Sequence, residues 1–445
     1  MPWTVEQALA LAPDPASAKS GKDLSSARKW KTLGVDAACA WGTIQGSGKD
    51  PYQTSIDLGG PAFKCSCPSR KFPCKHGLGL LLILAQQPAA LTEKTPPTWT
   101  SEWLAKRVEK EEKKAAKAAE PEVPPDPETA ARAAAAAEKR AAARENKVTA
   151  GLDDLGVWLR DLVRTGFAVL PGKPPSFWEA PATRLVDAQA PGLARRVSDL
   201  DNIATRGEDW PVRLLRETAR MHLAREAWSR IDRLPADTQA DLRSTLGFST
   251  NQEDVLASEG VHDQWLVVGR RITEEERLRV QRTWLFGHKT RRPALCLSFS
   301  AGPNQPLDVS LVPGDSVEAE LAFFPSAWPL RALVKQRFGP PESTRAEFPQ
   351  ATIAEACAFA AQALAAQPWL ERVPFALKAV FPVLRSEGWR CRDEARHWLP
   401  LRTADAAGWT LRALSGGKPL ALAGEWDGES LVPLSVRAEG RFLVL

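Results

Sequence analysis

The sequence lacks any long hydrophobic run. Its longest apolar stretch, from Leu78 to Ala85, is far shorter than the roughly 20 residues that a membrane-spanning helix needs. The first residues, MPWTVEQALALAPDPAS, have no basic segment ahead of an apolar one, so they do not predict a signal peptide. From these two absences we expect a cytoplasmic protein that has no membrane partner.

Cysteine is scarce, and neither sign of charge is in large excess. Three of the seven cysteines fall between residues 65 and 74, and the others are scattered: Cys39, Cys296, Cys357 and Cys391. In a reducing compartment this distribution favours a metal site over a disulfide framework. The formal net charge of +5 is small for 445 residues. It permits binding to nucleic acid without indicating it.

The common catalytic motifs are also missing. The sequence contains no G-x-x-x-x-G-K-[ST] loop, no dinucleotide fingerprint, no G-x-S-x-G elbow and no H-E-x-x-H. Cys391 and His397, with Asp393 and Glu394 between them, have the residue types of a nucleophile and its base. Nothing in the sequence places them together, and an isolated cysteine is usually a small apolar core residue. We therefore predict that the chain is not an enzyme.

The composition is that of a globular protein, with 44% hydrophobic and 25% charged residues. A chain of 445 residues is too long for one ordinary core, so several domains are expected. We predict an α+β multidomain protein with four parts: an N-terminal region over 1–94 whose β-β-α core is 35–90, a charged and Ala-rich helical linker over 95–147, an α-helical middle domain over 148–250, and an α+β C-terminal region over 251–445.

The predicted linker has almost no large apolar side chain with which to build a core. Ala, Glu, Lys and Arg are strong helix formers, so we expect solvated helical segments, interrupted by proline near PEVPPDPE. After the linker, Leu152, Leu155 and Leu159 recur at helical spacing, which indicates the α-helical domain. From about residue 260 the period changes toward two, which indicates strands.

Local patterns predict particular elements around and beyond the cysteine cluster. Cys39–Gln45 and Gln53–Leu58 read as the strands of a hairpin, and the apolar run after His76 reads as a helix. The pattern over Ser25–Leu33 predicts a short helix ahead of the hairpin. Farther along, Leu307–Val312 predicts a strand and Pro374–Leu384 predicts a helix.

The most specific pattern in the chain is C-x-C-x6-C-x-H, formed by Cys65, Cys67, Cys74 and His76. Three thiolates and an imidazole complete a tetrahedral set for Zn²⁺. Because protein supplies all four ligands, no position remains for an activated water, so we expect one structural zinc ion rather than a catalytic one. Iron–sulfur ligation is an alternative, which this spacing on a β-β-α pattern suits less well.

The stretch AWGTIQGSGKDPYQTSIDLGGPAFKCSCPSRKFPCKHGLGLLL resembles the finger of bacterial SWIM zinc finger proteins. The resemblance implies that Cys65, Cys67, Cys74 and His76 hold zinc in a non-catalytic module that binds DNA or protein. Bacterial members are associated with MoxR-type AAA ATPases and von Willebrand A-domain proteins, so the resemblance implies a protein partner of one of these kinds. We therefore expect a protein-interaction adaptor, with DNA or RNA binding as the alternative.

The loop inside the motif is basic, which keeps the nucleic-acid alternative open. Five residues are candidates for contact with nucleic acid or a partner: Lys64, Arg70, Lys71, Phe72 and Lys75. The cations can contact phosphates, and the aromatic ring can stack on an unpaired base. Equally, the cations can solvate the loop and balance the thiolate charge. A second basic concentration, between residues 270 and 292, is open to the same two interpretations.

Overall fold

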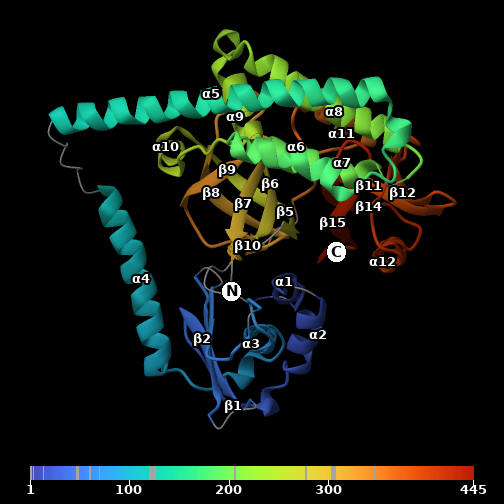
Figure 1. Ribbon diagram of the computed structural model, residues 1–445. Coiled ribbons are helices and arrows are strands. Elements are labelled where there is room, and N and C mark those ends of the chain that lie inside the picture. The colour runs from blue at the N-terminus through green and yellow to red at the C-terminus, as the bar shows by residue number, and fades with distance from the viewer. Residues whose placement is uncertain are drawn as a thin grey trace.

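The structure is a computed structural model of the chain (Figure 1). It describes residues 3, 5–13, 15–46, 50–59, 62–69, 71–119, 127–204, 207–275, 278–301, 307–343 and 346–445. Two short helices, four strands and a third helix come first, further helices follow, and two sheets complete the chain. The predicted α+β multidomain fold class is therefore confirmed. Among the helices it describes, none is both long enough and apolar enough to cross a bilayer.

The N-terminal region is a four-stranded antiparallel sheet covered by helix α3 (Lys75–Gln86). Two helices and four strands precede it: α1 (Val5–Ala10), α2 (Pro15–Asp23), β1 (Trp30–Val35), β2 (Cys39–Ile44), β3 (Tyr52–Asp57) and β4 (Ala62–Cys65). The strands pair in sequence order. Residues 78–83 of the apolar run that predicted α3 are buried in the core of this region, which explains why the helix carries Leu and Ile on all sides.

The prediction of a helix over Ser25–Leu33 was wrong. Ala27–Lys29 makes one 3-10 turn, and the chain then enters β1. The register of β1 on β2 shifts between Trp30 and Thr32. Trp30 and Leu33 are both buried in the same core, although residues three apart on a regular strand face opposite ways. The irregular strand thus produces a spacing that otherwise indicates a helix.

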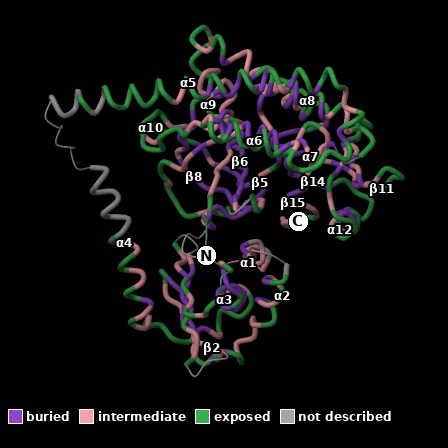
Figure 2. Tube along the Cα trace, viewed as in Figure 1, coloured by how far each residue is buried: buried purple, intermediate pink, exposed green. Residues whose placement is uncertain are grey.

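Two long helices connect the N-terminal region to the rest of the chain. Helix α4 (Thr98–Ala119) begins on the sheet, where the hydroxyl groups of Thr100 and Ser55 share a buried hydrogen bond of 2.9 Å. Helix α5 (Pro127–Thr165) runs through the predicted boundary at residue 147 without interruption. Residues 135–143 of α5 are exposed (Figure 2), whereas from Val148 onward one face is buried. The end of the predicted linker and the start of the helical domain are one helix.

The second half of α5 packs with four further helices: α6 (Pro175–Asp187), α7 (Pro191–Ala204), α8 (Trp210–Trp228) and α9 (Ala236–Leu246). Leu152, Leu155 and Leu159 of α5 all lie in their shared core, as the helical spacing predicts. The short helix α10 (Gln252–Ala257) then leads to the first strand of the C-terminal region.

The C-terminal region contains two six-stranded sheets. The first has the order β10-β8-β5-β6-β7, with β9 paired to β8, and its strands are β5 (Gly260–Glu275), β6 (Leu278–Gly287), β7 (Pro293–Ser300), β8 (Asp315–Phe323), β9 (Ala332–Arg337) and β10 (Glu342–Ser343). The second has the order β13-β12-β11-β14-β15-β16. Its strands are β11 (Val373–Arg385), β12 (Gly388–Arg392), β13 (Trp398–Pro400), β14 (Leu420–Trp426), β15 (Leu431–Ala438) and β16 (Arg441–Val444). The same part of the chain contains helices α11 (Ile353–Ala366) and α12 (Asp405–Ser415).

Two local predictions in this region were wrong. The expected helix over Pro374–Leu384 is strand β11, whose residues Phe375 and Ala376 pack into two different cores on its two faces. With both faces apolar, the alternation that marks a strand is lost. The expected strand over Leu307–Val312 is an irregular segment between β7 and β8. It is nevertheless largely buried, which accounts for its apolar sequence.

This irregular segment joins the C-terminal region to the N-terminal one. Val309 and Val312 lie in the same core as α3 and its sheet. Beside them, Gln7 of α1 donates a 2.5 Å hydrogen bond to Asp315 at the start of β8. In Figure 1 the N-terminal region accordingly lies beneath the first C-terminal sheet. The two regions are held together by packed side chains as well as by α4 and α5.

Candidate metal centre

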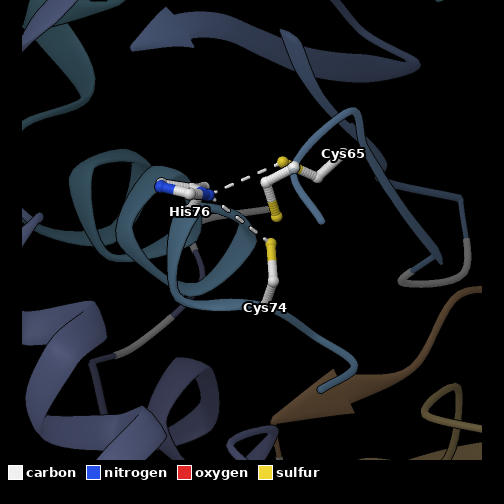
Figure 3. A group of neighbouring side chains, drawn as sticks. Cys65, Cys74 and His76 are labelled. Atoms are coloured by element: carbon white, nitrogen blue, oxygen red, sulfur yellow. Dashed lines mark hydrogen bonds between the residues drawn. The ribbon is translucent and has the colours of Figure 1, made fainter. Parts of the chain in front are cut away.

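The four residues of the C-x-C-x6-C-x-H motif lie together in the structure. One ligand atom from each of Cys65, Cys67, Cys74 and His76 falls within 4.8 Å of all the others. Figure 3 shows Cys65, Cys74 and His76 turned toward a common centre. Cys65 ends β4, Cys67 lies in the following loop, and Cys74 and His76 lie at the start of α3. A sheet edge and a helix terminus therefore meet at the centre.

The C-x-C pair reaches one centre because side chains two residues apart on an extended chain lie on the same face. Cys65 still pairs with Thr54 of β3, and the Thr54 hydroxyl lies 3.3 Å from its sulfur. The next residue, Ser66, closes the ladder: its amide donates to the Gln53 carbonyl at 3.0 Å, and its hydroxyl accepts from the Gln53 amide at 2.9 Å. Beyond Ser66 the chain leaves the sheet, so Cys67 lies in the loop that leads to α3.

Backbone amides near the sulfurs also favour the thiolate form. Cys74 is the N-cap of α3, and the amide of Gly77 in the first turn acts to lower the pKa of its thiol. The amide of Ser69 acts in the same direction on the pKa of Cys67. Such donors stabilise thiolate charge and orient the ligands of a metal site. The sequence does not predict this role of Gly77 and Ser69, because their backbone amides perform it rather than their side chains.

The pKa values of the cluster show how strongly its four side chains affect one another's protonation. Hydrogen bonds from the Cys65 and Cys74 thiols lower the pKa of Cys67, whereas hydrogen bonds to Cys65 and Cys67, together with burial, raise the pKa of Cys74. Burial lowers the pKa of His76, but contact with Cys65 and Cys67 outweighs it and raises that pKa to about 9. Three thiols this close cannot all ionise unless a positive charge lies among them. The donor set fits a dication.

The surroundings of the centre are closed. Cys74 and His76 are 6% and 5% exposed, and Cys65 and Cys67 are half-buried. The ring of Tyr52 lies 5.1 Å from the His76 ring. Three sulfurs and one imidazole nitrogen are the ligands of structural zinc sites, so the cluster is compatible with one zinc ion whose ligands are all protein.

Among the predicted contact residues that the structure describes, Lys64 lies apart from the others. Lys64 is exposed on β4 and pairs with Ser55, so it lies on the face of the sheet that carries α4, away from Cys65. Lys71 and Lys75 are exposed in the loop and the first turn of α3. Phe72 is half-buried and packs edge-on against Phe63, with ring centroids 6.0 Å apart. The fifth candidate, Arg70, lies outside the described residues.

The second basic concentration, between residues 270 and 292, is partly internal. The side chains of Arg270 and Arg282 are buried. Arg271 and Arg282 bind opposite oxygens of Glu425 at 3.1 and 3.0 Å, and that carboxylate is 0% exposed. Arg277 lies outside the described residues. Two of these arginines are therefore neutralised inside the protein, by a residue too far along the chain for the sequence pattern to suggest.

Cys391 and His397 do not form a nucleophile and its base. Cys391 is 0% exposed on β12, and burial raises its pKa to about 12. The His397 ring instead lies 3.2 Å from the carboxylate of Asp393, which also accepts from the Ile353 amide at the start of α11. A buried neutral thiol is a poor nucleophile. Asp393 therefore holds the start of helix α11.

The comparisons with known proteins agree with this geometry. The model of the SWIM zinc finger matches residues 56–85, which run from β3 to α3, and the model of the SWIM-associated four-helix bundle domain matches residues 143–246, which run from the second half of α5 to α9. Searches of curated proteins and of solved structures returned no match. The predicted family resemblance is confirmed: the chain carries a SWIM zinc finger, built on Cys65, Cys67, Cys74 and His76, followed by the helical domain that accompanies such fingers.

Proposed function

We propose that the chain is a non-catalytic, cytoplasmic interaction protein, in which one zinc ion holds the N-terminal finger in the shape that a protein partner binds. The observation that carries the proposal is the closed ligand set, four protein side chains within 4.8 Å of one another. With all four positions taken by protein, the metal has none left for water or substrate. Its role is then to stabilise a surface rather than to react.

Two features favour a protein partner over nucleic acid. The ring of Phe72, which would have to stack on a base, is half-buried against Phe63. Lys64 lies on the other face of β4 from the metal centre, so it does not extend the basic loop around Lys71 and Lys75. Lys71 and Lys75, the cations of this loop that the structure describes, are by themselves weak support for phosphate binding, because each phosphate contact adds little at physiological salt.

The partner classes that the family resemblance implies are a MoxR-type AAA ATPase and a von Willebrand A-domain protein. The test uses the zinc-loaded full-length chain and purified candidates of both classes from the same organism. We expect one of them to bind the wild-type chain and Cys357→Ser, because Cys357 is an exposed cysteine on α11, far from the finger. We expect Cys74→Ser to lose the binding, because it removes a metal ligand.

A titration with single- and double-stranded DNA and RNA separates the alternative. If the finger binds phosphates through the four cations at 64, 70, 71 and 75, the logarithm of the affinity should fall against the logarithm of the salt concentration with a slope of roughly −3 to −4. Binding of that kind, without binding to either protein class, would contradict the proposal. So would protein binding that Cys74→Ser leaves unchanged.

A further inference from the structure

A cavity of about 480 Å³ lies between the helical bundle and the C-terminal region, far along the chain from the zinc finger. Helices α7 and α9 and strands β6 and β7 line it. Segments 324–331 and 367–372 complete the lining. Its volume is in the range of small-molecule sites, which are commonly found where domains meet.

Five arginines line this cavity, and carboxylates hold three of them. Arg196 lies 3.1 Å from Glu371, and Arg195 binds the same carboxylate. Arg282 binds Glu275 at 3.1 Å as well as the buried Glu425. The remaining acid of the lining, Asp241, accepts a 2.8 Å hydrogen bond from the Ala327 amide. This bond holds segment 324–331 against α9. The acids of the lining are thus already engaged.

The other two arginines carry positive charge that the lining does not balance. Arg331 forms no ion pair with any residue that the structure describes; its guanidinium lies 4.0 Å above the ring of Phe324. Arg372 is 3.8 Å from Glu425, but Arg271 and Arg282 already bind that carboxylate, so three cations share one anion. Burial lowers the pKa of both Arg331 and Arg372. Both cations would gain from an anion in the cavity.

The strand wall beside these arginines is apolar. Leu295, Leu297 and Phe299 alternate along β7 on the cavity side, and Phe299 is 40% exposed. Trp328, also in the lining, is half-buried. These side chains form an apolar surface against which a ligand can pack. The lining therefore offers both cations for an oxyanion and a surface for an apolar or aromatic group.

We propose that this cavity binds a small organic anion, one with a phosphate or carboxylate head held by Arg331 and Arg372 and an aromatic or apolar body packed on Phe299 and Leu297. This site is independent of the finger and of its partner. Arginine suits such a head because its planar donors bind two oxygens at once. The three arginines already paired with acids are neutralised by them and do not bind the ligand themselves.

The test is calorimetric titration of the zinc-loaded full-length chain with four probes: 1-naphthyl phosphate, 1-naphthoate, 1-naphthol and inorganic phosphate. We expect one of the two naphthyl anions to bind at least roughly tenfold more tightly than naphthol and than inorganic phosphate, because it satisfies both halves of the cavity. Which anion binds better tells whether the natural head is a phosphate or a carboxylate.

Two variants with matched controls locate the binding. Arg331→Gln should weaken the naphthyl anion roughly tenfold or more, whereas Arg385→Gln, which removes an arginine stacked on Trp398 elsewhere, should not. Phe299→Ser should weaken it similarly, whereas Leu384→Ser, at 39% exposure on β11, should not. Failure of both naphthyl anions to bind at about 1 mM, where a functional site of this kind should be occupied, would overturn the proposal. Equal binding by wild type, Arg331→Gln and Phe299→Ser would overturn it too.

Discussion

The three cysteine sulfurs of the finger and the His76 ring lie close enough together to bind one metal ion. Removing one sulfur should therefore affect the whole ligand set. We expect Cys74→Ser to lower the zinc content from one ion per chain toward none and to abolish the unfolding transition of the finger. Zinc binding of this type supplies roughly 10–16 kcal/mol of apparent folding free energy at neutral pH. Metal analysis and calorimetry measure both effects.

The matched control for this variant is Cys357→Ser, which changes an exposed thiol on α11. It should keep one zinc ion per chain and an unchanged finger transition. If Cys74→Ser binds zinc as tightly as the wild type, the assignment of Cys74 as a ligand is wrong.

Gly79 shows how tightly α3 is held. A Cβ atom there would lie 2.9 Å from the Leu24 Cβ and 3.2 Å from the Leu24 carbonyl oxygen. Ala has a better helix propensity than Gly by about 1 kcal/mol, but overpacking against backbone costs about 1–3 kcal/mol. We expect Gly79→Ala to destabilise the finger on balance, seen as a lower midpoint in urea. Gly339→Ala, where no atom lies within 4 Å, should not.

The two C-terminal sheets are joined by one buried carboxylate. Glu425 on β14 accepts from Arg282 and from the Trp284 indole of β6, each at 3.0 Å. Removing it would leave Arg282 buried without that partner. We expect Glu425→Ala to destabilise the C-terminal region by about 3–5 kcal/mol, measured by urea unfolding. Glu429→Ala, which removes a half-exposed ion pair with Arg216, should cost about 1 kcal/mol or less.

The elements that could be predicted from the sequence are those whose cause is local. The four metal ligands lie within twelve residues, and α3 follows them as one apolar run, so their spacing alone indicated the centre. The same holds for Leu152, Leu155 and Leu159 of α5. Each of these patterns repeats within a few turns of one element.

The elements that could not be predicted depend on partners distant in the chain. Strand β1 carries an irregularity imposed by its pairing with β2, and β11 is covered on both faces, so neither shows the usual alternation. The buried partner of Arg282 lies 143 positions away. The cavity is made by walls from two domains. No short window of sequence contains such information.

Across the whole molecule, the finger and the C-terminal region share a core through Val309 and Val312. Loss of zinc should therefore be felt beyond the finger. After chelation we expect amides of residues 35–90 to lose protection from hydrogen exchange, and amides of 307–312 to lose it with them, while the bundle of α5 to α9 stays protected. If segment 307–312 keeps its protection when the finger has lost it, the shared core does not stabilise that segment.

The same contact between regions contains a buried acid. Burial raises the pKa of Asp315 from 3.8 to about 6, against the hydrogen bond that it accepts from Gln7. Because the folded-state pKa is the higher one, the folded form binds more protons at this residue, and the contribution of Asp315 to stability falls as the pH rises between these two values. We expect Asp315→Asn to remove this contribution and to raise the thermal midpoint at pH 7. The same pH dependence of the midpoint in the wild type and in Asp315→Asn would contradict the assignment.

Tyr52, whose ring lies beside His76, is the single tyrosine among 445 residues. Growth on 3-fluorotyrosine would therefore place one fluorine nucleus in the chain, on the ring that lies next to the metal ligand His76. Its magnetic resonance spectrum would contain one line for each state of the finger, with no overlapping signal from any other position. The line areas would count zinc-loaded and zinc-free molecules directly, even with a large partner bound.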